Sequence, residues 1–134
     1  MKNRIILYTI FLFFIGCNID TEEVHGNFTL EKNDIKEILI VKRGFLYNRR
    51  IFNKVTGEKI KEFNGTWSYK NRVISFESFF KGYFSVKLYD LYKIDSTKYI
   101  NNNVSLNVDK SLGNLFFEVT EFGKVIARYK KIKS

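Results

Sequence analysis

The chain has 134 residues, a formal net charge of +9 and no proline, and 17% of its residues are aromatic. Its single cysteine and single histidine exclude a disulfide framework and leave almost no ligands for a zinc site. We therefore expect no metal or other cofactor, and the folded state must depend on burial of apolar side chains.

The first segment, Lys2 to Cys17, has the form of a secretory signal. Two cations, Lys2 and Arg4, precede an uncharged apolar run from Ile5 to Ile15, and Gly16 follows. A charged start, an apolar centre and a small residue before the cleavage point are typical of such signals. The apolar run has eleven residues, well short of the ~20 that a membrane-spanning helix needs.

The end of this segment, Phe14-Ile15-Gly16-Cys17, resembles the lipobox of bacterial lipoprotein signal peptides. The resemblance implies that the Cys17 thiol receives a diacylglycerol, that residues 1–16 are removed, and that the new amino group is acylated. An ordinary secretory signal would instead leave an unpaired cysteine at an exposed N-terminus. A buried helix is a further alternative, but no later segment offers it a helical partner. We expect a lipid-anchored protein of the cell envelope, in the outer membrane, on its periplasmic or surface face.

Loss of the signal would leave 118 residues and a net charge of +7, enough for one domain. Residues 17–25 are expected to be an acidic tether, because they carry Asp20, Glu22 and Glu23 and show no hydrophobic period. The acidic cluster is similar to the surface-display signal of some Gram-negative groups, and a solvated linker is the alternative. Residues 26–134 are then the single folded domain.

From Gly26 the chain consists of short apolar segments separated by turns. Ile35–Val41 is apolar on both faces, as expected for a strand buried on both sides or for a short helix. Phe45–Asn53 is expected to be a strand. Lys59–Phe63 continues through Asn64-Gly65 into Thr66–Tyr69, and this dipeptide predicts either a hairpin or a bulge within one bent strand.

The second half alternates more regularly between apolar and polar residues. Besides Val73–Phe76, four alternating segments are centred on Val86, Leu106, Phe117 and Ala127. Residues 76–80 are the other stretch that could be helical. Period two with regular turn signals predicts an all-β fold, an antiparallel β-barrel or sandwich of about eight strands. A closed sheet is favoured, since strands without proline would leave unprotected edges.

Three short patterns resemble those of small bacterial lipoproteins with a lipocalin-like β-barrel domain. They are Gly26-x-Phe28-x-Leu30, Gly44-Phe45 and Gly65-Thr66-Trp67. In that group the Trp of a G-x-W tripeptide packs across the barrel mouth. In true lipocalins the tripeptide lies on the first strand, whereas here it is near mid-chain, so no pocket residues are carried over. Alternation alone places Trp67 in the core.

Two kinds of residue are candidates for contact with a ligand or partner. Aromatic side chains come from the strand after Gly65 and from the aromatic-rich stretch 76–84, and cations come from a basic run that includes Lys42, Arg43 and Lys54. The candidates are Trp67, Tyr69, Phe79, Phe80, Tyr83, Arg49 and Arg50. Core packing for the aromatics and a solvated barrel face for the cations are the structural alternatives.

No catalytic constellation is visible. His25 has no nucleophile beside it, and neither a glycine-rich phosphate loop nor a G-x-S-x-G elbow occurs. We therefore expect a monomeric protein that is not an enzyme and, being exported, does not bind nucleic acid. Two functions remain: a lipid-anchored envelope protein that binds a small apolar ligand or an envelope component, and an inhibitor or immunity lipoprotein that neutralises a toxin by protein–protein contact.

Overall fold

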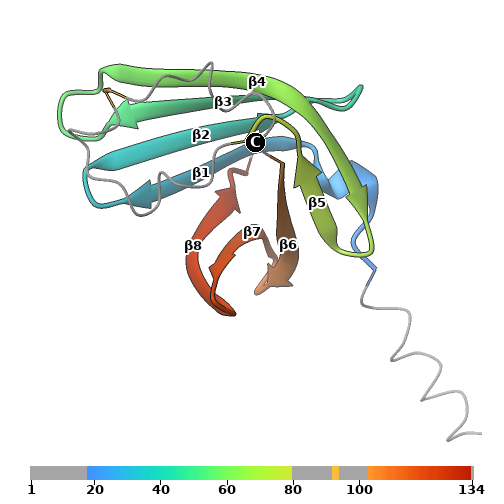
Figure 1. Cartoon of the computed structure of the whole chain (residues 1–134). Helices are drawn as coiled ribbons and strands as arrows, with labels where there is room; N and C mark the ends of the chain where they lie inside the picture. Colours follow the sequence, from blue (N-terminus) through green and yellow to red (C-terminus); the bar gives the residue numbers. More distant parts are fainter. Residues whose placement is uncertain (1–17, 80–91, 94–102, 134) are drawn as a thin grey trace, which may run out of the picture.

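The computed structural model describes residues 18–79, 92–93 and 103–133 and forms a closed β-barrel (Figure 1). Eight antiparallel strands follow one another around the barrel in chain order, and β8 pairs with β1 to close it. The strands are β1 (Gly26–Lys32), β2 (Ile35–Val41), β3 (Leu46–Asn53), β4 (Lys59–Lys70), β5 (Val73–Phe76), β6 (Val104–Ser111), β7 (Asn114–Glu121) and β8 (Lys124–Lys131). The all-β prediction is confirmed, and the sheet is a barrel rather than a sandwich.

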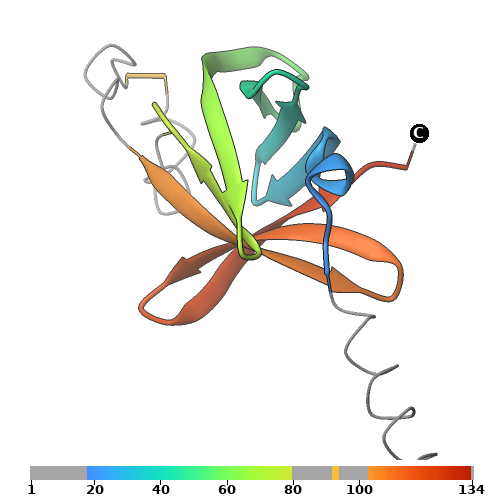
Figure 2. The same ribbon diagram turned by 90° about the vertical axis from the view of Figure 1, so that its right-hand side faces the viewer.

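The barrel consists of two halves, strands β1–β4 and strands β6–β8, which separate toward one end. Seven residue pairs join β1 to β2, whereas only Phe28–Lys131 and Thr29–Lys130 join β1 to β8. Figure 1 shows β1–β4 running across the view while β6–β8 run downward, so the halves cross at a steep angle. Figure 2 is a view along strands β1–β4 from the end where the N-terminal segment lies.

Strand β4 connects the two halves. It is one continuous strand of twelve residues that pairs with β3 up to Thr66 and with β5 from Trp67. The hairpin predicted at Asn64-Gly65 is therefore wrong, and the bent-strand alternative is correct, although the register shift with β3 lies nearer the start of β4. Gly65 allows the Tyr47 ring and the backbone carbonyl of Glu77 to approach the strand closely, because a Cβ at this position would collide with both.

The strand β2 shows how the interior is filled. Its burial alternates strictly, with Ile35, Glu37, Leu39 and Val41 buried and the residues between them half-buried. The helical alternative for this segment is thus wrong, and the stretch 76–80 begins with the last residue of β5. Inside the barrel, aromatic rings contact one another across the strands, as in the stacked pair Phe28–Phe117 with ring centres 4.0 Å apart.

The expected tether is part of the barrel from its third residue onward. Ile19 is 5% exposed, and Val24, the last residue of the 3₁₀ turn η2 (Thr21–Val24), is fully buried. Both side chains belong to the apolar core. Hydrophobic periodicity does not predict the burial of Ile19 and Val24, because two apolar residues five positions apart in an acidic segment form no repeat. Within the described chain, residues 19–25 therefore cover one end of the barrel instead of forming a free linker.

Candidate functional site

The most buried polar group of the barrel interior is an ion pair between β2 and β3. The Arg49 Nε donates to Glu37 Oε2 at 2.8 Å and its Nη2 donates to Oε1 at 3.1 Å, a two-pronged contact. Arg49 is fully buried and Glu37 is 1% exposed. The Tyr129 hydroxyl, from β8, donates to the same carboxylate, and the Phe79 ring lies 4.1 Å from the guanidinium carbon.

This arrangement gives Arg49 a structural role. Burial, the largest influence, raises the pKa of Tyr129 well above its usual value, so its hydroxyl stays protonated and can donate. The guanidinium is matched by a carboxylate and covered by an aromatic ring. The prediction that Arg49 contacts a partner at the surface is therefore wrong: its side chain points inward, and Arg50 beside it points outward.

Trp67 is buried, as alternation predicts, and it lies under the N-terminal segment. It is 3% exposed, its indole N–H donates to the Lys42 carbonyl at 3.0 Å, and its ring contacts His25 and Phe45 at centre distances of 5.2 and 5.4 Å. On the same face, the Tyr69 hydroxyl donates to the Ile19 carbonyl at 2.8 Å. These two candidates therefore bind the segment over residues 19–25 and close this end of the barrel.

The aromatic-rich stretch contributes to the core as far as it is described. Phe79 is fully buried and stacks on Phe76 with ring centres 5.0 Å apart. Phe80 and Tyr83, the other two candidates from this stretch, lie outside the described residues, as does the alternating segment around Val86.

The basic run does not form one continuous positive surface. Besides Arg49, three of its cations, Arg43, Arg50 and Lys54, pair with acids on different parts of the barrel, so these charges are locally balanced. The pairs are Arg43–Glu22 at 3.1 Å, Arg50–Glu62 at 3.4 Å and Lys54–Glu31 at 2.8 Å.

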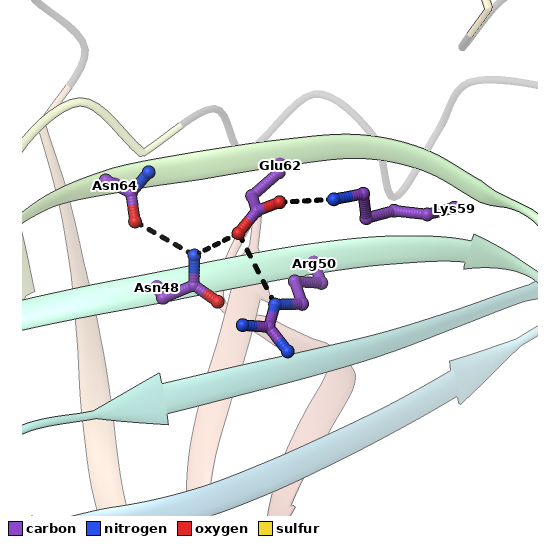
Figure 3. A network of polar contacts seen from close by, with 5 residues as sticks. All are labelled: Asn48, Arg50, Lys59, Glu62 and Asn64. Atoms are coloured by element: carbon purple, nitrogen blue, oxygen red, sulfur yellow. Dashed lines mark hydrogen bonds and ion pairs between the residues drawn. The ribbon is translucent and has the colours of Figure 1, made fainter.

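A polar network lies on the outer face of β3 and β4 (Figure 3). The Asn48 side-chain amide donates to Glu62 at 2.7 Å and to Asn64 at 2.9 Å. Arg50 and Lys59 also donate to the Glu62 carboxylate. The Asn48 oxygen points away from both acceptors in Figure 3, is buried, and has no hydrogen-bond partner among the described residues.

The Glu62 carboxylate, at the centre of this network, is stabilised in its charged form. Hydrogen bonds, first from Lys59 and then from Asn48, lower the pKa of Glu62 to about 2. Glu62 therefore remains an anion at any pH near neutrality and keeps Arg50 in place on the outer surface.

Apolar side chains lie directly beside the network on β2. Cross-strand pairing places Ile38 opposite Arg50 and Ile40 opposite Asn48. Both isoleucines are half-buried and point outward, since their neighbours Glu37, Leu39 and Val41 are the buried ones. We call Ile38, Ile40, Asn48, Arg50 and Glu62 the outer patch.

Of the five residues of the outer patch, only Arg50 is among the contact residues predicted from the sequence. The signal for Ile38 and Ile40 is the apolar character of Ile35–Val41 on both faces, which equally predicts a strand buried on both sides or a short helix; no local pattern indicates Asn48 or Glu62. In an antiparallel sheet with one solvated face, such a strand instead carries isoleucines toward the outside.

The described residues contain no cluster of three or more His, Cys, Asp or Glu side chains suited to a metal ion. Nor does this part of the chain include a helix long and apolar enough to cross a membrane. Comparisons with protein-family profiles, with curated proteins and with solved structures found no match for this chain.

Proposed function

We propose that this protein is a lipid-anchored binding protein of the cell envelope. Its anchor is the diacylated Cys17, its location is the outer membrane, and it binds a macromolecular envelope component through the outer patch. The residues after Gly16-Cys17 lead into a folded barrel, as expected of a domain held by an N-terminal lipid.

The outer patch is the observation that carries the binding role. Surface-facing positions of an antiparallel barrel are usually polar, yet Ile38 and Ile40 occupy two neighbouring ones. They adjoin an arginine held by Glu62 and an asparagine whose buried oxygen has no donor among the described residues. Apolar side chains next to a positioned arginine are typical of the energetically important centres of protein interfaces.

The surroundings of Trp67 argue for a surface site and against an apolar ligand enclosed beside it. Its indole is in contact with His25, Phe45 and the Lys42 carbonyl, and it is 3% exposed. Phe76, Phe79 and the ion pair of Arg49 occupy the interior further along. A ligand bound beside these rings would have to displace core side chains.

The same observation favours a second candidate, an inhibitor or immunity lipoprotein that neutralises a toxin by protein–protein contact. Such a protein needs a solid core and a contact surface. The outer patch, with half-buried isoleucines beside the partly exposed Arg50, would serve it equally well. A gene for an exported toxin beside this one would favour the inhibitor over the envelope-binding role.

The lipid anchor gives the first testable prediction. The wild-type protein is expected to incorporate a fatty-acid probe in growing cells and to fractionate with membranes, whereas Cys17→Ser should do neither. The physical reason is that each buried methylene contributes about 0.8 kcal/mol, so several acyl chains hold a protein firmly at a bilayer. A wild-type protein that is unlabelled and fully soluble would contradict the proposal.

The second prediction concerns the outer patch. A photo-crosslinking amino acid at Ile40 should give a discrete adduct in cells, and Arg50→Glu should abolish that adduct by reversing the charge next to it. Position Ser105 is the matched control, because it is exposed on β6 in the other half of the barrel. Equal adducts from both positions, or none from Ile40, would show that this face binds no partner.

A further inference from the structure

We propose that the barrel has no spacer from its anchor and rests with its N-terminal end directly on the phospholipid bilayer. By N-terminal end we mean η2, the β2–β3 and β6–β7 turns, and the residues after β8. The inference rests on the lipidation of Cys17 proposed above. It replaces the expectation that an acidic tether holds the domain away from the membrane.

The length of free chain is the first step of the argument. Ile19 is 5% exposed in the core, and its carbonyl accepts a hydrogen bond from Tyr69. Only Asn18 separates Ile19 from Cys17. A residue spans at most about 3.6 Å, so the acylated cysteine lies within roughly 7 Å of a buried core residue. A bilayer that holds the acyl chains must therefore touch this end of the barrel.

The segment over residues 19–25 is also bound to the barrel by several contacts. These contacts would have to break before the segment could extend as a tether. The Glu22 carboxylate pairs with Arg43 at 3.1 Å, and the Glu23 carboxylate pairs with Lys110 at 3.0 Å. Lys131 donates to the Glu23 carbonyl. These bonds join η2 to the β2–β3 turn, to β6 and to β8, and the fully buried Val24 adds apolar contact.

The N-terminal end presents apolar side chains to its surroundings. Phe45, in the β2–β3 turn, is 59% exposed, and Leu46, the first residue of β3, is 54% exposed. At the tip of the β6–β7 turn, Leu112 is 99% exposed. Ile132, after β8, is 46% exposed, and its N–H donates to the Asn27 carbonyl at the start of β1. In Figure 2 the two turns and the chain after β8 surround η2. Apolar tips beside a lipid anchor are suited to insertion among lipid headgroups.

Cations lie between these tips. A hollow of about 230 Å³ separates η2 from the β6–β7 turn and the C-terminal residues, and its lining includes Lys110, Lys131 and Lys133 together with Glu23. Burial lowers the pKa of Lys131. Lys42 and Arg43 lie on the other side of η2, near Glu22. Arg43 and Lys110 already pair with Glu22 and Glu23. The attraction of anionic lipid phosphates at a membrane surface therefore falls mainly to Lys42, Lys131 and Lys133.

The opposite end of the barrel supplies a matched control. Phe122, in the β7–β8 turn, is 99% exposed like Leu112, each has a φ of 49°, and each precedes a glycine. The eight residues of β7 separate the two turns, a distance of roughly 25 Å along a strand. A label at Phe122 should therefore remain in water when a label at Leu112 reaches the bilayer.

The test uses the lipidated protein in vesicles of phosphatidylethanolamine and phosphatidylglycerol. Cys17 is the only cysteine of the chain and its thiol is consumed by acylation, so Leu112→Cys and Phe122→Cys each provide one reactive thiol for an environment-sensitive dye. We expect a blue-shifted emission and several-fold stronger quenching by nitroxide lipids at position 112, and an aqueous spectrum at position 122.

The remaining outcomes overturn the inference in distinguishable ways. If the protein floats with the vesicles but both dyes report water, the anchor is present and the segment over residues 19–25 has opened into a tether. If both dyes are immersed equally, the barrel lies on its side. If the protein fails to float and carries no fatty acid, the proposed lipidation itself is wrong and the inference fails with it.

Discussion

Glu37→Gln is expected to destabilise the barrel by about 3–5 kcal/mol, because it removes the carboxylate charge that pairs with the buried guanidinium of Arg49. The side chain keeps its volume, so the loss reports on charge and not on a cavity. Both partners are almost completely shielded from water, and the same carboxylate accepts the Tyr129 hydroxyl. Denaturant unfolding followed by circular dichroism measures the free energy of unfolding.

The matched control is Glu62→Gln, which makes the same chemical change in an ion pair at the surface. Glu62 pairs with Arg50, whose side chain is 43% exposed, at 3.4 Å. Water solvates the partner that remains, so we expect a far smaller loss than for Glu37→Gln. The double variant Glu37→Leu with Arg49→Met should recover much of the loss, since apolar residues can replace a buried pair. Equal losses for the two Gln variants would contradict the role of the interior pair.

Trp67→Ala is expected to cost about 3–5 kcal/mol, the range typical of a large aromatic side chain replaced by a cavity. The variant loses the ring contacts with His25 and Phe45 and the hydrogen bond to the Lys42 carbonyl. Circular dichroism in denaturant measures the loss. Since Trp67 is the only tryptophan, the emission of the native wild type should be blue-shifted and should move to the red on unfolding.

A milder change on the same face serves as control. Tyr69→Phe removes only the hydroxyl that donates to the Ile19 carbonyl, so about 1 kcal/mol is expected. A native emission already shifted to the red, together with a stability change near zero for Trp67→Ala, would mean that the indole faces water and that the end of the barrel is open.

The sequence by itself determined the strands and the direction of many side chains. Pleating makes successive residues of a strand point to opposite faces, so the period-two segments around Leu106, Phe117 and Ala127 predict β6, β7 and β8. The same rule placed Trp67 in the core, and its burial confirms this. These inferences succeed because alternation is a local property of the backbone.

Only the tertiary structure decided which residues meet. Pleating turns Arg49 and Arg50 to opposite faces, but only the pairing of β2 with β3 puts Arg49 against Glu37. Closure of the barrel then brings Tyr129 from β8 to the same carboxylate, while Arg50 lies on the outer patch. Closure likewise brings the acidic segment around Val24 against strands that lie far away in the chain. The physical reason is that register, barrel closure and packing of an end segment depend on contacts between distant residues, and no local pattern records them.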